Sequence, residues 1–121
     1  MKILIAEDET MLLKIMELRL KKEGHQVITV TDGREALRQL DTNTFDLVIT
    51  DIMMPFISGL EIISIVKERN KNLPVIILSA MGQENVVVEA FKLGADDFIT
   101  KPLSPNELSM RIRRFETVVY S

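Results

Sequence analysis

Acidic side chains follow two short apolar runs of this chain. Glu7 and Asp8 come directly after the run at residues 3–5, and Asp51 follows the run at residues 47–49. Carboxylates about 4 Å apart repel one another by roughly 1–4 kcal/mol per pair at effective dielectric constants of about 80 to 20. A cluster of these acids would therefore need a cation, and oxygen ligands without cysteine or a nearby histidine favour Mg²⁺ over zinc or copper.

A lysine and a serine stand at the ends of two further apolar runs. Lys101 comes after residues 98–99, and Ser79 ends the run at residues 75–78. An aspartate such as Asp51 can attack phosphorus and form an acyl phosphate. A bound metal ion and the lysine ammonium would neutralise charge on the transferred group, and the serine hydroxyl could donate to a phosphoryl oxygen.

Five short apolar runs alternate with longer amphipathic stretches, and this order predicts how the side chains are positioned. Continuous rather than alternating hydrophobicity is typical of strands buried on both faces. Repeated strand–helix alternation predicts an α/β fold, an open parallel sheet with helices on both faces. The residues that follow the strands then emerge at one edge of the sheet. The predicted strands are residues 3–5, 27–30, 47–49, 75–78 and 98–99.

Helical spacing of apolar residues marks the stretches between these runs. Gly24 and Gly94 are predicted to end the first and fourth helices, and Ser104 followed by Pro105 to begin the last. His25, the only histidine, is predicted to lie on the surface. The apolar faces are Leu13, Met16 and Leu20; Ala36, Leu37 and Leu40; Ile62, Ile63 and Val66; and Leu108, Ile112 and Phe115.

Composition is ordinary for a globular protein. The 121 residues, 46% apolar and 27% charged, predict one domain over residues 1–121. The net charge of −3 favours neither nucleic acid nor an anionic membrane as a direct partner, and the absence of cysteine excludes disulfide chemistry. No apolar run reaches the length of a membrane span or a signal-peptide core, so a cytoplasmic protein is predicted.

The motifs together resemble the receiver domain of two-component response regulators, over essentially the whole chain. Any one of them is weak evidence, whereas five in order at strand ends are specific. The resemblance implies a flavodoxin-like, doubly wound five-stranded sheet in the order 2-1-3-4-5 with five helices. The motifs are Glu7-Asp8, residues 51–55 with Ser58-Gly59 behind them, Ser79-Ala80, residues 94–99, and Thr100-Lys101-Pro102.

The resemblance also implies the role of each site residue. Asp51 would accept a phosphoryl group from a sensor histidine kinase. Asp8 and Asp51 would bind Mg²⁺ directly, together with the main-chain carbonyl of Met53, and Glu7 would bind it through water. Lys101 would contact a phosphoryl oxygen, with its bond to Pro102 in the cis form. Glu7 departs from the family's commoner aspartate.

A switch role follows from the same resemblance. Ser79 would turn toward the phosphoryl group, and Phe98 would swing inward, which relays phosphorylation to an output domain or partner. The domain would catalyse only its own phosphotransfer and dephosphorylation, so it is predicted to be a signalling switch and not an enzyme.

The start of the last helix, residues 104–108, resembles receivers that precede winged-helix DNA-binding domains. This predicts transcription regulation, with DNA bound only through an effector domain that this chain does not contain. A homodimer on activation would use Asp97, Glu107, Arg111 and Arg113. Where the subfamily commonly has a basic and an acidic residue on the fourth helix, this chain has residues 86–88, three valines, and Lys92. A weak dimer of more apolar character is therefore predicted.

Other interpretations of the same residues remain. A haloacid-dehalogenase-like phosphatase would need an acid two residues after Asp51, where Met53 stands. A flavodoxin would need a phosphate-binding loop after the first strand, where this chain has acids. A docking-only pseudo-receiver would not need the complete acid set. Taken singly, Asp8 could be a helix cap, Lys101 a solvated lysine, and Phe98 a core residue.

Overall fold

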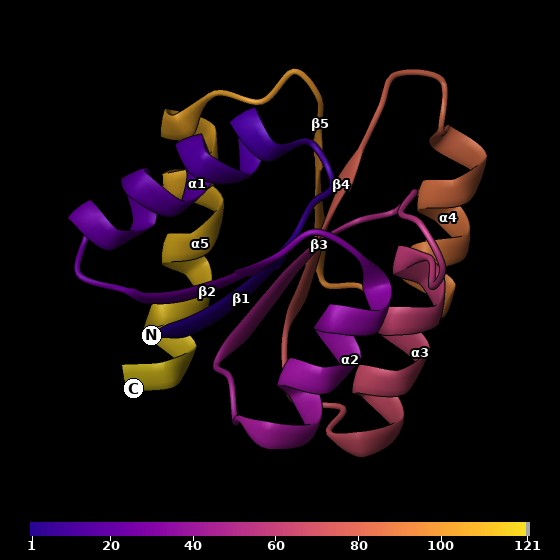
Figure 1. Ribbon diagram of the computed structural model, residues 1–121, viewed down its shortest axis with the longest axis horizontal. Helices are drawn as coiled ribbons and strands as arrows, with labels where there is room; N and C mark the ends of the chain where they lie inside the picture. The colour runs from indigo at the N-terminus through magenta and orange to yellow at the C-terminus, as the bar shows by residue number, and fades with distance from the viewer. Residues whose placement is uncertain (121) are drawn as a thin grey trace.

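A single parallel sheet forms the centre of the molecule. The computed structural model describes the backbone of residues 1–120 and the side chains of residues 1–116. The strands pair in the order β2-β1-β3-β4-β5, which confirms the predicted topology (Figure 1). Each strand is the predicted apolar run extended by one or two residues. The strands are β1 (Lys2–Ala6), β2 (Gln26–Val30), β3 (Leu47–Asp51), β4 (Val75–Ser79) and β5 (Asp97–Thr100).

Five helices cover the sheet in two layers. The α1 and α5 helices pack on one face, and α2, α3 and α4 pack on the other (Figure 1). Each layer encloses its own apolar core, because strands buried on both faces present side chains to both helix layers. The helices are α1 (Thr10–Lys22), α2 (Gly33–Thr42), α3 (Gly59–Arg69), α4 (Glu84–Lys92) and α5 (Pro105–Tyr120). No helix of the described residues is long and apolar enough to cross a membrane.

The helix ends follow the sequence signals. The Ser104 hydroxyl accepts a hydrogen bond from the Glu107 N–H at 3.1 Å, so Ser104 caps α5 as predicted. Gly24 and Gly94 follow α1 and α4 with φ of 93° and 112°, a backbone conformation that favours glycine. These turns send the chain back to the sheet for the next strand.

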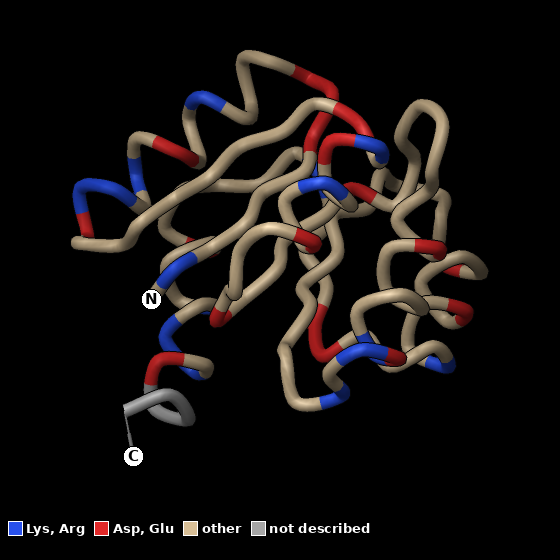
Figure 2. Tube along the Cα trace, turned by 60° about the horizontal axis from the view of Figure 1, so that its bottom comes forward, with Lys and Arg blue, Asp and Glu red and all other residues tan. Residues whose placement is uncertain are grey.

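Strand register brings the expected residues to one edge. Ala6 pairs with Thr50, so the acids that follow β1 lie beside Asp51 at the end of β3. Ser79 pairs with Thr100, which places Lys101 beside the end of β4. Figure 2 shows acidic residues gathered at one edge of the trace, near a few basic ones. The carboxyl edge of this sheet therefore carries the candidate site.

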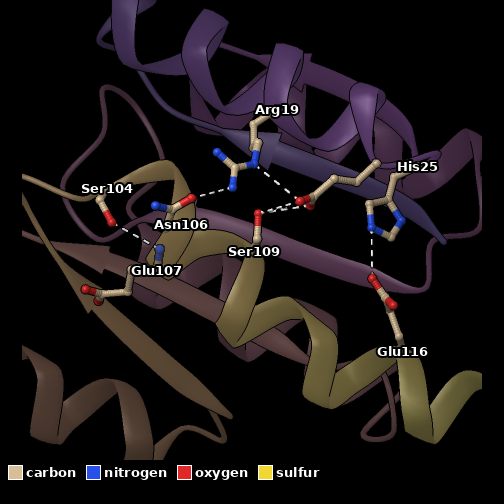
Figure 3. Close-up of polar contacts among 8 residues, drawn as sticks. Arg19, His25, Ser104, Asn106, Glu107, Ser109 and Glu116 are labelled. Atoms are coloured by element: carbon tan, nitrogen blue, oxygen red, sulfur yellow. Dashed lines mark hydrogen bonds and ion pairs between the residues drawn. The ribbon is translucent and has the colours of Figure 1, made fainter.

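The prediction that His25 lies on the surface was wrong. Its side chain is 5% exposed because the turn at Gly24 places it under the end of α5. The His25 Nε2 atom lies 3.0 Å from Glu116 Oε1, and Nδ1 lies 3.2 Å from the Met1 nitrogen. Figure 3 shows the contact between His25 and Glu116, together with the hydrogen bond from Arg19 on α1 to Asn106 on α5. His25 therefore packs between the turn that follows α1 and the α5 helix.

Candidate functional site

Lys101 joins two acids at the carboxyl edge of the sheet. Its Nζ atom lies 2.6 Å from Asp51 Oδ2 and 2.6 Å from Glu7 Oε1. Asp51 is 5% exposed, so its carboxylate is almost buried yet still open at the edge. The peptide bond between Lys101 and Pro102 is cis, as predicted. The structure thus brings together the end of β3 and the segments that follow β1 and β5.

The three acids form a group that could bind a metal ion. Carboxylate oxygens of Glu7, Asp8 and Asp51 all lie within 4.8 Å of one another. Glu7 is fully buried, and its Oε1 atom forms an ion pair with Lys101. One ammonium cannot neutralise three carboxylates, and an oxygen-only donor set suits a hard divalent cation. The residues present therefore fit a divalent ion.

Burial dominates the electrostatics of Glu7. The pKa of Glu7 is raised from 4.5 to about 7, chiefly by the loss of hydration on burial and, to a smaller extent, by the charge of Asp51. The Lys101 ammonium and the Glu9 N–H, which donates to Glu7 Oε2 at 3.0 Å, act in the opposite direction. Burial lowers the pKa of Lys101, but Asp51 and Glu7 outweigh burial and the net shift is upward. Lys101 is therefore a permanent cation here.

We expect the stability of the metal-free protein to fall as pH rises through the range set by Glu7. The unfolded carboxyl ionises near 4.5 and the folded one near 7. Between these values the folded state holds a proton that the unfolded state releases, so stability is present at low pH and lost as pH rises. The loss is up to about 3 kcal/mol.

Urea unfolding with a chelator, at about pH 5 and about pH 8, measures this effect. In Glu7→Gln the carboxyl is absent, so the pH dependence should flatten by the same amount. An identical pH profile in wild type and Glu7→Gln would contradict the upward shift of the Glu7 pKa.

The hydrogen bond from the Glu9 N–H to the Glu7 carboxylate was not predicted from the sequence. It uses a backbone group, so the type of residue at position 9 gives no signal of it.

Asp51 is tied to the segment that follows it. The Met53 N–H donates to Asp51 Oδ1 at 3.1 Å, while the Met53 side chain is 58% exposed. At the far end of the segment, the Gly59 N–H donates to the Ile52 carbonyl at 2.8 Å. A Cβ atom added at Gly59 would overlap the Asp51 carbonyl oxygen, so this approach requires glycine. Residues 52–58 therefore form a loop closed at its base against Asp51.

The two predicted switch residues line the same cavity. Ser79 is 1% exposed at the end of β4, and its carbonyl accepts a hydrogen bond from the Lys101 N–H at 2.7 Å. Phe98 is 36% exposed and meets Phe91 edge-to-face, with ring centroids 5.9 Å apart. A cavity of about 400 Å³ is lined by Ser79, Phe98 and Val87 among others. Phe98 lines this space rather than filling it.

The predicted interface residues show one internal network. Asp97 is buried, and its carboxylate lies 3.4 Å from a guanidinium nitrogen of Arg111 and 3.4 Å from one of Arg114, both on α5. Arg114 was not among the predicted residues. Asp97 and Arg111 thus pair within one chain. Of the other two predicted residues, Arg113 is exposed on α5 and Glu107 is half-buried near the start of that helix.

The α4 helix presents the apolar feature expected of it. Val88 is 53% exposed, whereas Val86 and Val87 pack against the core. Lys92 is exposed and lies 3.7 Å from Glu89 on the same helix. A dimer interface over α4 would therefore include the exposed side chain of Val88, and the charge of Lys92 would be partly offset by Glu89.

The comparisons with known proteins agree with this geometry. A family model described as the response regulator receiver domain matches residues 3–113. The response regulator SaeR of Staphylococcus epidermidis is 43% identical over 109 residues, which are 90% of this chain and 47% of that protein. The alkaline phosphatase synthesis transcriptional regulatory protein PhoP of Bacillus subtilis is 36% identical over 112 residues, 93% of this chain and 47% of that protein.

Solved structures show the same arrangement of strands and helices. The receiver domain of the Francisella response regulator 1452 superposes with a TM-score of 0.89 at 34% identity, covering 98% of each chain. The BeF3-activated DrrB receiver domain gives a TM-score of 0.88 at 34% identity, covering 96% of this chain and 97% of that one. The present chain spans about half the length of SaeR and PhoP.

Proposed function

Because the chain belongs to the family of response regulator receiver domains, we propose that Asp51 accepts a phosphoryl group from a sensor histidine kinase with Mg²⁺ bound. A receiver domain of this family serves phosphorylation-activated signalling in two-component systems. The observation that carries the proposal is the position of Lys101, 2.6 Å from Asp51, among acids that fit a divalent ion. The chain supplies the acceptor and its counter-charges, and the kinase supplies the phosphoryl group.

The chemistry assigned to the residues is direct. A carboxylate oxygen of Asp51 attacks the phosphorus of a phosphohistidine, a P–O bond forms, and the P–N bond breaks with its electron pair left on the imidazole. Asp8, Asp51 and the Met53 carbonyl would hold the metal directly and Glu7 would hold it through water, and the bound ion would stabilise negative charge on the phosphoryl oxygens. The Lys101 ammonium, 2.6 Å from Asp51, would do the same, and it stays protonated because the pKa of Lys101 is raised.

Two alternatives are less well supported. A phosphatase of the haloacid-dehalogenase type needs an acid where this chain has Met53, whose side chain is 58% exposed. A docking-only pseudo-receiver would have no reason to bury Glu7 and Asp51 around one ammonium, since buried charges are costly unless they are used. The domain therefore acts on itself and turns over no metabolite.

Dependence on Mg²⁺ is the first test. We expect wild-type protein treated with a small acyl phosphate to gain one phosphoryl group when Mg²⁺ is present and none when a chelator removes it. The reason is that the acids repel an incoming anion until a cation neutralises them. Intact-mass spectrometry measures incorporation, and equal incorporation with and without Mg²⁺ would remove the metal from the proposal.

The output is proposed from the relatives. PhoP of Bacillus subtilis is named as a transcriptional regulatory protein and is about twice as long as this chain. We place this domain in the cytoplasm, ahead of a DNA-binding effector domain that would carry the regulatory function. Phosphorylation would draw Ser79 toward the phosphoryl group and Phe98 into the cavity that both residues line, changing the surface at α4 and β5.

We expect a weak dimer after activation, through α4, β5 and α5. The exposed Val88 supplies apolar area, while Asp97 and Arg111 already pair within one chain. Moderate salt should therefore weaken the dimer by less than about tenfold, because screening acts on exposed charges and not on apolar contact. Sedimentation of beryllofluoride-treated protein at low and high salt measures this, with Val88→Ser as the weakened variant.

A strictly monomeric species at high micromolar concentration would defeat the dimer. A dimer that moderate salt abolishes would defeat its apolar character. Untreated protein is the control for dependence on activation.

A further inference from the structure

The tip of the loop after Asp51 has a strained backbone. Phe56 has φ of 70°, and the Ile57 N–H donates to the Pro55 carbonyl at 2.9 Å. A hydrogen bond across a single residue of positive φ defines the classic γ-turn, which is rare and strained. A bulky residue in this conformation is an outlier, and the Phe56 side chain, 68% exposed, gains little from burial. Something outside the loop must hold this turn.

The first turn of α2 supplies that support. The guanidinium carbon of Arg34 lies 3.5 Å from the centroid of the Phe56 ring, a close stacked cation–π contact. Gly33, beside it, touches the same turn, since a Cβ atom added there would overlap the Ile57 carbonyl oxygen. No ion pair among the described residues involves Arg34, and its guanidinium group stacks on the Phe56 ring.

The loop is thus held at two places. At its base, Gly59 and Ile52 close it against Asp51, and at its tip α2 holds Phe56 and Ile57. Met53 lies between these points, and its N–H donates to Asp51 Oδ1 at 3.1 Å. A change in conformation at the tip of the loop should therefore also displace Met53, whose N–H donates to the Asp51 carboxylate.

We propose that Arg34 is a positioning residue for metal binding: its stack on Phe56 holds the strained loop in the conformation that keeps Met53 against Asp51. The inference rests on the proposed Mg²⁺-dependent function. It concerns a residue on α2 that touches neither the acids nor Lys101. The same contact maintains the hydrogen bond from the Ile57 N–H to the Pro55 carbonyl. Hydrogen exchange of the Ile57 amide in the metal-free protein therefore also tests the inference.

If Arg34 acts only through its charge, Arg34→Ala should raise the affinity for Mg²⁺, whereas if Arg34 positions the loop, the same change should lower it. By charge alone, removal of a cation would strengthen the binding of Mg²⁺. If the stack holds the loop, the loss of Arg34 should weaken Mg²⁺ binding by about two- to fivefold, the range of an exposed cation–π contact. Arg38→Ala, another exposed arginine of α2, gives the effect of charge without the stack.

The experiment combines calorimetric Mg²⁺ titration with hydrogen exchange of the Ile57 amide in metal-free protein. We expect Arg34→Ala to weaken Mg²⁺ binding about two- to fivefold and to speed Ile57 exchange by a similar factor, with Arg38→Ala near wild type. Phe56→Gly should bind Mg²⁺ within about twofold of wild type, because glycine adopts positive φ without strain. In that background Arg34→Ala should have no further effect.

Several results would overturn the inference. Tighter or unchanged Mg²⁺ binding in Arg34→Ala would show that only charge acts, or nothing does. An equal loss in the Phe56→Gly background would show that Arg34 does not act through the ring. Wild-type protein that binds no Mg²⁺ would instead remove the proposed function, and Ile57 exchange would still decide whether the stack holds the turn.

Discussion

Asp51→Asn is expected to abolish incorporation of a phosphoryl group from an acyl phosphate. The amide keeps the shape of the side chain but is a poor nucleophile, and it removes the charge that faces Lys101 at 2.6 Å. The loss should exceed about a thousandfold, because Glu7, the other acid that meets the Lys101 ammonium, is fully buried and cannot reach a phosphoryl donor. Intact-mass spectrometry with Mg²⁺ present measures the result.

The matched control is Asp41→Asn. Asp41 is an exposed aspartate on α2, in an ion pair with Arg69 on the surface and outside the acid cluster. Its incorporation should equal that of wild type. Equal phosphate incorporation by wild type and Asp51→Asn would remove Asp51 as the acceptor and would leave another acid to be identified by peptide mapping.

Asp8→Ala is expected to weaken Mg²⁺ binding far more than Glu7→Ala. Asp8 is exposed at the edge and can give its oxygens to the ion, whereas Glu7 is fully buried and lies 2.6 Å from Lys101. Loss of a directly bound carboxylate should lower affinity by about a hundredfold or more. Loss of a group such as Glu7, which would bind the ion only through water, should lower the affinity for Mg²⁺ by about ten- to a hundredfold.

Calorimetric titration of both variants tests these roles, and Glu9→Ala is the control. Glu9 is an exposed neighbour whose backbone N–H, which the substitution retains, donates to Glu7. Glu7→Gln should be measured as well, since Glu7→Ala also leaves a cavity in the buried edge. A larger loss for Glu7 than for Asp8 would reverse the two assignments.

The sequence determined the architecture because its signals are periodic and local. Continuous apolar runs of the length of a strand, separated by stretches with helical spacing, predict a parallel sheet covered by helices on both faces. The carboxyl ends of parallel strands lie at one edge of the sheet. For that reason Asp51 and Lys101, which are 50 residues apart, could be expected to meet. The helix start at Ser104 and the turns at Gly24 and Gly94 followed from capping and backbone freedom, which depend on a few neighbouring residues.

The tertiary structure decided everything that depends on how deeply a side chain is covered. Glu7 and Asp8 are adjacent acids in the sequence, yet only the fold buries Glu7 fully, raises its pKa to about 7 and leaves Asp8 exposed. His25 became buried because the end of α5 covers it, and Asp97 was drawn into an internal ion pair. Burial and desolvation arise from contacts between distant segments, so residue type and spacing alone could not give them.

The strained turn at Phe56 also lay beyond the sequence. Nothing in the letters Pro55-Phe56-Ile57 requires a positive φ at phenylalanine, and turn rules would place glycine or asparagine there. The loop adopts this conformation because Gly59 closes its base on Asp51 and α2 meets its tip through Gly33 and Arg34. The sequence determined which residues reach the edge of the sheet, and packing between non-adjacent helices and loops decided how each is held there, because strain persists only where surrounding contacts over-determine it.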